Sequence, residues 1–339
     1  MSFELGHTTG DYEFIDVLDS SKAGVTYKVR NVVAQRFEAL KVLPRTWQED
    51  QERIERFLRE TKVHARLRHP NIVAFYNAGR LDSQMIMTTE LVEGLTLEQV
   101  LEGGPLGISE SVRYMVQALK ALDYAHESGV VHREITPAHM IVTPEGTLKL
   151  TGFGLAKVAN SPQLTQVGAV MGSLEYISPE QVKGASNLDG RADLYSLGVV
   201  FYQAVTGKLP FESASQFDLM LAHVNLTPRP PIELREDLPP EINDAILRAL
   251  AKDPMERYRS ARDFWQALEE VAPPAEAAKA EPEVEAPHPG IPTGAPVLPG
   301  FPPVAPATTW TTPQLMAAGI FLFLMMALAF YVVLTAARP

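Results

Sequence analysis

The chain has 339 residues, of which 30 are basic (Lys and Arg) and 41 are acidic (Asp and Glu), so its formal net charge is −11 at pH 7. Since no long basic run offsets this acidity, the composition argues against a protein that binds nucleic acid. The sequence contains no cysteine, which excludes disulfides, thiolate zinc sites and a cysteine nucleophile. The first residues include Glu4 and Asp11 and no apolar run, so we expect no secretory signal.

The N-terminal third of the chain predicts a small sheet with one helix. Five segments are rich in β-branched and aromatic residues and bounded by turn residues, which is typical of strands. They cover residues 11–20, 24–31, 36–44, 69–79 and 85–94. Between the third and fourth of these, residues 48–67 are charged and carry apolar side chains at helical spacing, which predicts an amphipathic helix.

The next part of the chain is mainly helical in its pattern. Residues 96–128 hold two helical patterns, which lead into the stretch at 130–157. A strongly apolar helix is predicted to begin near Asp193, and amphipathic helices are predicted at 239–252 and 261–271.

Short motifs follow one another in a fixed order within residues 8–271. They are Lys41 in E-A-L-K, Glu60 in the predicted helix, His132-Arg133, Phe153-Gly154, Pro179-Glu180, Asp193 and Arg257. In this order they resemble the motifs of the protein kinase superfamily, of the bacterial eukaryotic-like Ser/Thr type. The resemblance implies an α+β, two-lobed protein kinase fold, with a five-stranded small lobe that carries one helix and a mainly helical large lobe.

The same resemblance implies a nucleotide-binding site. Its members would be Lys41, Glu60, Gly24, Ala39, Glu90, Val92 and Ile141. Lys41 is the expected partner of the α- and β-phosphates, and Glu60 is its expected ion-pair partner. Ala39 and Ile141 would pack on the two faces of adenine, and the hinge at residues 90–92 would hydrogen-bond its edge.

The resemblance also implies a structural framework around the catalytic loop. Its members would be His132, Arg133, Phe153, Glu180, Asp193 and Arg257. Asp193 is expected to clamp the backbone of the catalytic loop, and Arg257 is expected to form a buried ion pair with Glu180.

The three positions that carry the chemistry in this family are changed. Glu134 replaces the Asp of H-R-D, His139 replaces the loop Asn, and Gly152 replaces the Asp of D-F-G. Gly152 offers no side-chain oxygen, and imidazole is a poor ligand for hard Mg²⁺. Glu134 keeps a carboxylate but displaces it by about an ångström, a misplacement that costs roughly a hundredfold in rate. A softer metal ion held by Glu134 and His139 would lack a third ligand. In the phosphate loop, Asp19 puts a negative charge where the family has glycine.

We therefore predict a catalytically impaired pseudokinase, which serves as a scaffold or allosteric partner of cytoplasmic signalling proteins or of an active kinase. We expect at most weak ATP binding, without Mg²⁺ and without a metal site. The alternative is an active ATP-dependent Ser/Thr protein kinase of low activity, which Lys41 and Glu60 favour. Another ATP-dependent transfer reaction has no specific support in the sequence.

The C-terminal region changes composition twice. Residues 272–314 are rich in Pro and Ala and cannot bury a core, which predicts a disordered linker, either a plain tether or a strip for proline-recognising domains. Residues 315–335 contain no charge and, as a helix, would span a ~30 Å hydrocarbon core. A buried core helix would show a polar face, which is absent here. We expect a single-pass tail anchor in the lipid bilayer of the cell membrane, with the kinase-like domain cytoplasmic.

Overall fold

The computed structural model describes residues 3–21, 24–44, 64–153, 174–185 and 187–271, together with positions 54, 57, 58, 61 and 62. All of them belong to the first of the two units into which the chain divides, residues 1–279. The predicted linker at 272–314 and the predicted membrane span at 315–335 lie outside the described residues. Among the described helices, none is both long and apolar enough to cross a bilayer.

The N-terminal part forms a six-stranded antiparallel sheet in the order β1-β2-β3-β4-β6-β5. The strands are β1 Thr8–Thr9, β2 Tyr12–Ser21, β3 Gly24–Asn31, β4 Arg36–Val42, β5 Phe75–Leu81 and β6 Gln84–Glu90. The five predicted strands are present, and the expected number was one too low. The additional β1 pairs with the start of β2 because a turn at Gly10, whose φ is +55°, folds the N-terminal segment back.

The two faces of this sheet differ because successive side chains of a strand point to opposite faces. In β4, Leu40 and Val42 are buried and join the cluster around Phe14 and Tyr27. Lys41, between them, lies on the other face together with Ala39, and both are half-buried. The sheet therefore keeps one fully packed face and presents Lys41 on the other.

The predicted helix at 48–67 is described only in part. Positions 54, 57, 58, 61, 62 and 64 are helical. Phe57 packs with Met85 and Met87 in a small cluster beside the sheet. Glu60, the expected partner of Lys41, lies outside the described residues.

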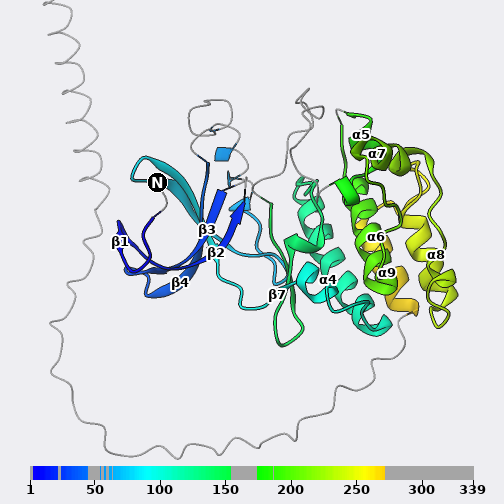
Figure 1. The fold of residues 1–339 in the computed structure, drawn as a ribbon, viewed down its shortest axis with the longest axis horizontal. Helices are drawn as coiled ribbons and strands as arrows, with labels where there is room; N and C mark the ends of the chain where they lie inside the picture. The colour runs from blue at the N-terminus through cyan, green and yellow to red at the C-terminus, as the bar shows by residue number, and fades with distance from the viewer. Residues whose placement is uncertain are drawn as a thin grey trace, which may run out of the picture. The chain divides into compact units, whose positions relative to one another are not determined.

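The rest of the described chain is mainly helical, with a small three-stranded sheet. The helices are α3 Leu97–Leu101, α4 Ile108–Glu127, α5 Pro179–Val182, α6 Arg191–Thr206, α7 Gln216–Asn225, α8 Pro240–Ala249 and α9 Ala261–Val271, and the strands are β7 Leu95–Thr96, β8 Met140–Val142 and β9 Leu148–Leu150. Figure 1 shows strands β1–β4 at one end of the described unit and helices α5–α9 at the other. The expectation of a sheet-rich small lobe and a helical large lobe is confirmed.

Helix α6 is the centre of the large lobe, because it is apolar on nearly all sides and almost wholly buried. It packs against α4 and α8, and it ends at Gly207, whose φ of +71° stops the helix. The prediction missed α7, although Ser215 caps it by accepting a hydrogen bond from the Asp218 N–H, a spacing that the sequence shows.

Candidate functional site

Asp193 fixes the catalytic loop from the first turn of α6, as predicted. Its carboxylate accepts hydrogen bonds from the backbone N–H groups of His132 at 2.8 Å and Arg133 at 2.7 Å. The His126 ring Nε2 lies 2.8 Å from the same carboxylate, which is only 1% exposed. Arg133 has a φ of +66°, unusual for a residue other than glycine, so the clamp holds the loop in a conformation that costs free energy.

Glu180 and Arg257 form the predicted buried ion pair. The guanidinium of Arg257 donates to both carboxylate oxygens of Glu180, at 2.7 and 2.8 Å. It also donates to the backbone carbonyls of Ala251, Arg191 and Lys252. This one side chain therefore ties α5, which carries Glu180, to α6 and to the loop that follows α8.

The His139 ring lies close beside Gly152, so it would crowd a side chain placed at that position. Gly152 has a φ of +87°, and a Cβ built on it would lie 3.1 Å from His139 Cδ2. The His139 ring is held in place because its Nδ1–H donates to the Glu134 carbonyl at 2.9 Å. Within the described residues no group of three or more His, Cys, Asp or Glu side chains is placed to hold a metal ion. These residues do not fit Mg²⁺, which requires oxygen ligands in near-octahedral geometry.

Two carboxylates act on the charge of Lys41, that of Asp19 from the small lobe and that of Glu134 from the catalytic loop. In the sheet register Asp19 stands opposite Thr26, and Thr26 stands opposite Lys41. Directly opposed residues point to the same face, so Asp19 and Lys41 share the face described above. Burial lowers the pKa of Lys41, and the carboxylates of Asp19 and then Glu134 oppose that shift.

Gly24 occupies the last glycine position of the predicted phosphate loop, and the sheet itself requires it. Its φ is +127°, and a Cβ at this position would meet the Val42 carbonyl oxygen at 2.2 Å. No side chain fits at that distance. The structure therefore gives Gly24 a packing role that does not depend on a bound phosphate.

The predicted adenine positions remain partly exposed. Ala39 on β4 and Ile141 on β8 are half-buried, and so is Val92 in the hinge. The Glu90 carboxylate pairs with Lys149 at 2.8 Å and accepts from the Ala74 N–H at 3.1 Å. The side chain of Glu90 thus fixes the start of the hinge.

A row of aromatic rings connects the helix of the small lobe with the catalytic loop. The ring centroids of His64 and Phe153 are 5.9 Å apart, and those of Phe153 and His132 are 4.6 Å apart. His64 donates from Nε2 to the Val73 carbonyl at 3.0 Å, while its buried Nδ1 has no hydrogen-bond partner among the described residues. Burial lowers the pKa of His64, and burial lowers the pKa of His132 to about 4.

The substitution His64→Leu is expected to make unfolding less sensitive to acid. Because burial lowers the folded-state pKa of His64, the unfolded chain takes up this proton more readily, and wild-type stability is lost as the pH falls below about 6.5. Leucine does not titrate, so the difference in unfolding free energy between variant and wild type should move in favour of the variant between neutral and mildly acidic pH. Urea denaturation at several pH values measures it, and a difference independent of pH would contradict the expectation.

Two contacts of the catalytic loop were not predicted. His126 binds the Asp193 carboxylate, and nothing in the local sequence signals it, because the two residues come together only through the packing of α4 on α6. Gln181 donates from its side-chain amide to the Arg133 carbonyl at 2.8 Å. Its capping-box partner Ser178 is visible in the sequence, but the long-range contact is not.

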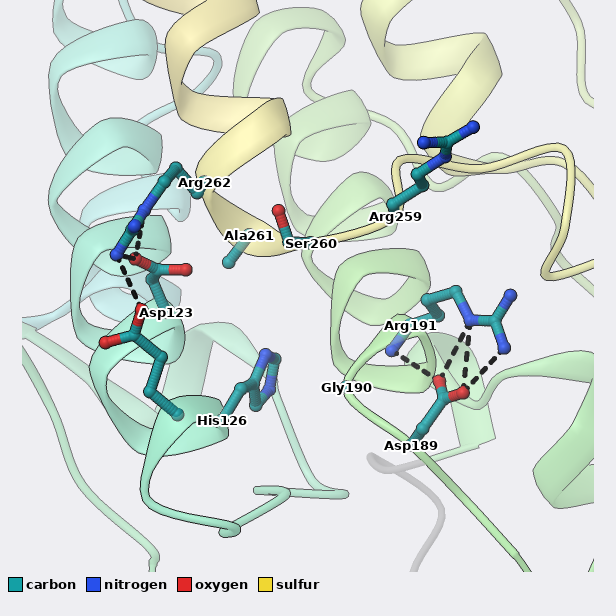
Figure 2. A pocket seen from close by; sticks show the side chains of 10 residues that line it. Asp123, His126, Asp189, Gly190, Arg191, Arg259, Ser260, Ala261 and Arg262 are labelled. Atoms are coloured by element: carbon teal, nitrogen blue, oxygen red, sulfur yellow. Dashed lines mark hydrogen bonds and ion pairs between the residues drawn. The ribbon is translucent and has the colours of Figure 1, made fainter.

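A hollow lies away from the predicted site residues, where the ends of α4, α6 and α9 meet (Figure 2). It has a volume of about 490 Å³ and contains three arginines, Arg191, Arg259 and Arg262. Two of them are paired with carboxylates, Arg191 with Asp189 at 2.7 Å and Arg262 with Asp123 at 2.7 Å. Since these charges largely neutralise one another, we assign the hollow no function.

Comparison with known proteins gives one consistent result. The family described as "Protein kinase domain" matches residues 12–268. The chain is 34% identical over 257 residues to the serine/threonine-protein kinase PrkC of Bacillus subtilis, covering 76% of this chain and 40% of that protein. It is 36% identical over 280 residues to PknA of Mycobacterium tuberculosis, covering 80% of this chain and 64% of that protein. The crystal structure of the M. tuberculosis PknI kinase domain superposes with a TM-score of 0.64 at 30% identity, covering 79% of this chain and 99% of that one. The chain thus spans less than two thirds of the curated relatives that it matches.

Proposed function

Because this chain belongs to the protein kinase family, among the bacterial eukaryotic-like Ser/Thr kinases, we propose that it keeps the body of a kinase and has lost efficient phosphoryl transfer. It would act as a signalling scaffold or allosteric partner for an active kinase or another cytoplasmic protein. The segment at 315–335 would anchor it in the cell membrane, and the linker at 272–314 would hold the kinase-like domain on the cytoplasmic side.

The contact between His139 and Gly152 carries this proposal. In the family, the side chains at these two positions hold the metal ions that neutralise the charge of the transferred phosphoryl group. Here the Gly152 position has no side chain, and a Cβ placed there would lie only 3.1 Å from the His139 ring. A metal ion contributes several kcal/mol to the transition state, and each ~1.4 kcal/mol is a factor of ten in rate.

The framework that shapes a kinase body is retained. Asp193 clamps the catalytic loop, and Arg257 holds Glu180 of α5. Neither interaction requires a nucleotide or a metal ion. These two interactions support a rigid large lobe, and a rigid lobe presents a fixed surface to which a partner protein docks.

A kinase of low activity is the second candidate, and one observation favours it. Glu134 keeps a carboxylate in the catalytic loop, and its charge acts on Lys41. A carboxylate at this place is able to accept the proton of a substrate hydroxyl.

An assay of phosphate incorporation distinguishes the two candidates. It uses the full-length chain, which we expect to recover from the membrane fraction. Wild type and Lys41→Met are compared with ATP and either Mg²⁺ or Mn²⁺. We expect wild type to incorporate no more phosphate than Lys41→Met, because neither protein assembles the metal site. Autophosphorylation that Lys41→Met abolishes would overturn the pseudokinase proposal and establish the low-activity kinase.

A further inference from the structure

We propose that Met255 is an oxidation site, at which a hydroperoxide converts the thioether to a sulfoxide that Arg191 then binds. The inference goes beyond the proposed function and does not depend on it, because neither residue belongs to the site around Lys41. It begins from the sulfur content of the chain, which has 11 methionines and no cysteine. Oxidation of side-chain sulfur in this chain therefore falls on thioethers alone.

Met255 is far more accessible than the other methionines that the structure describes. It lies in the loop between α8 and α9 and is 75% exposed. Met220 is half-buried. The remaining described methionines are at most 8% exposed, and they are Met85, Met87, Met115 and Met140. Since oxidation of a sulfur follows its exposure, a hydroperoxide should reach Met255 first.

The sulfur of Met255 lies against a guanidinium. Arg191 Nη1 donates to the Met255 Sδ at 2.8 Å and to the Pro254 carbonyl at 3.4 Å. Another edge of the same guanidinium is paired with Asp189, whose carboxylate lies 2.7 Å from Nη2 (Figure 2). The backbone of Met255 is fixed as well, because its N–H donates to the Asp253 carboxylate at 2.8 Å. The guanidinium and the methionine are thus each held in place beside one another.

Oxidation at this sulfur needs a hydroperoxide and no group from the protein. A lone pair of Sδ attacks one peroxide oxygen, so that an S–O bond forms while the O–O bond breaks. The proton on the transferred oxygen passes to the leaving hydroxide, which departs as water. The sulfur is oxidised by two electrons and the peroxide is reduced by two. Methionine sulfoxide reductases reverse this change in proteins, so the modification is able to act as a switch.

The product should bind Arg191 more strongly than the thioether does. A thioether sulfur is a weak acceptor, whereas a sulfoxide oxygen is polar, and a bond from a charged donor is about twice as strong as one between neutral groups. The Arg191 side chain is only 26% exposed, so water competes weakly for it. Helix α6 begins at Arg191, whose carbonyl accepts from Arg257 at 2.9 Å. Oxidation should therefore tighten the loop of Met255 against the start of α6.

Peptide mass spectrometry tests where peroxide acts. The full-length chain in mild detergent is treated with hydrogen peroxide, and the conversion of each methionine is followed with time. We expect Met255 to be oxidised at least roughly tenfold faster than the buried Met115 and Met140. In denaturant the three rates should converge, because the difference comes from burial in the folded protein. Equal rates in the folded protein would overturn the inference.

Thermal denaturation tests whether Arg191 uses the new oxygen. Met255→Gln places a carbonyl oxygen on a side chain of similar length, and Met255→Leu is the matched control without an acceptor. Wild type oxidised only at Met255, and Met255→Gln without peroxide, should each melt about 1–3 °C above Met255→Leu. Arg191→Gln should abolish the difference between the two Met255 variants. Arg259→Gln should preserve it, since Arg259 lines the neighbouring hollow and does not donate to Met255.

These outcomes distinguish a bound sulfoxide from an exposed methionine that is simply reactive. A melting temperature of the oxidised protein no higher than that of Met255→Leu would overturn the inference, even if Met255 is oxidised first. A gain in stability that survives Arg191→Gln would overturn it too, because the oxygen would then have another partner. A gain that requires Arg191 and not Arg259 would support it.

Discussion

The triple variant E134D/H139N/G152D is expected to transfer phosphate in a Mg²⁺-dependent assay, whereas G152D alone is expected to remain inactive. A side chain at position 152 would begin 3.1 Å from the His139 ring, and it would sit at a φ of +87°, which costs a residue other than glycine about 1–3 kcal/mol. Replacing His139 by the smaller asparagine removes the ring and supplies an amide oxygen. With both metal ligands restored, the rate should rise by roughly two orders of magnitude or more above wild type.

The comparison of G152D with H139N/G152D gives this experiment its most specific test. Thermal denaturation should show G152D to be less stable than H139N/G152D, because the second substitution relieves the contact created by the first. Lys41→Met added to the triple variant is the control and should abolish the gained activity. If G152D alone reached the activity of the triple variant, the contact between His139 and Gly152 would not be what separates this chain from an active kinase.

Arg257→Met is expected to destabilise the folded domain by about 3–5 kcal/mol, since removing one partner of a buried ion pair leaves the other charge without compensation. The Arg257 side chain is 0% exposed and that of Glu180 is 15% exposed, so water cannot replace the lost guanidinium. Three backbone carbonyls lose their donor as well. Chemical denaturation of the full-length chain, monitored by a signal from the folded domain, measures this loss of stability.

Arg262→Met provides the matched control for this prediction. Arg262 also pairs with two carboxylates, those of Asp123 and Glu127, both at 2.7 Å, but its side chain is 50% exposed. Exposed pairs contribute little to stability, so this variant should unfold close to wild type. The double variant R257M/E180Q should recover part of the stability lost in Arg257→Met, because the uncompensated charge is gone. Similar losses for the two arginine variants would mean that burial does not set the strength of these pairs.

The sequence predicted the framework of the fold more fully than it predicted the site. Asp193, Glu180 and Arg257 were assigned correctly because each occurs in a motif whose order along the chain identifies the position. The strands β2 to β6 were found because runs of β-branched and aromatic residues, and the turn residues that bound them, are local signals. Strand β1 is only two residues long and pairs only because of the turn at Gly10, so no local pattern predicted it.

The site depends on contacts that no local pattern contains. Gly152 and His139 were each identified as lost metal ligands, but the sequence does not show that the ring of His139 would crowd a Cβ at position 152. That contact depends on backbone dihedrals and on a ring orientation set by the Glu134 carbonyl. Likewise, the influence of Asp19 on Lys41 follows from the register of three strands, which the sequence alone does not fix. The expected pair of Lys41 with Glu60 stays a prediction, because Glu60 lies outside the described residues.

Gly24 is a glycine of the family's phosphate loop that this chain needs for a reason other than phosphate binding. A side chain there would collide with the Val42 carbonyl oxygen at 2.2 Å, whether or not a phosphate is bound. Substitution of Gly24 is therefore expected to distort the β2–β3 hairpin and its pairing with β4, whatever the loop binds. A search for retained loop glycines would assign this position to nucleotide binding. The glycine is required instead by the close approach of the neighbouring strand β4.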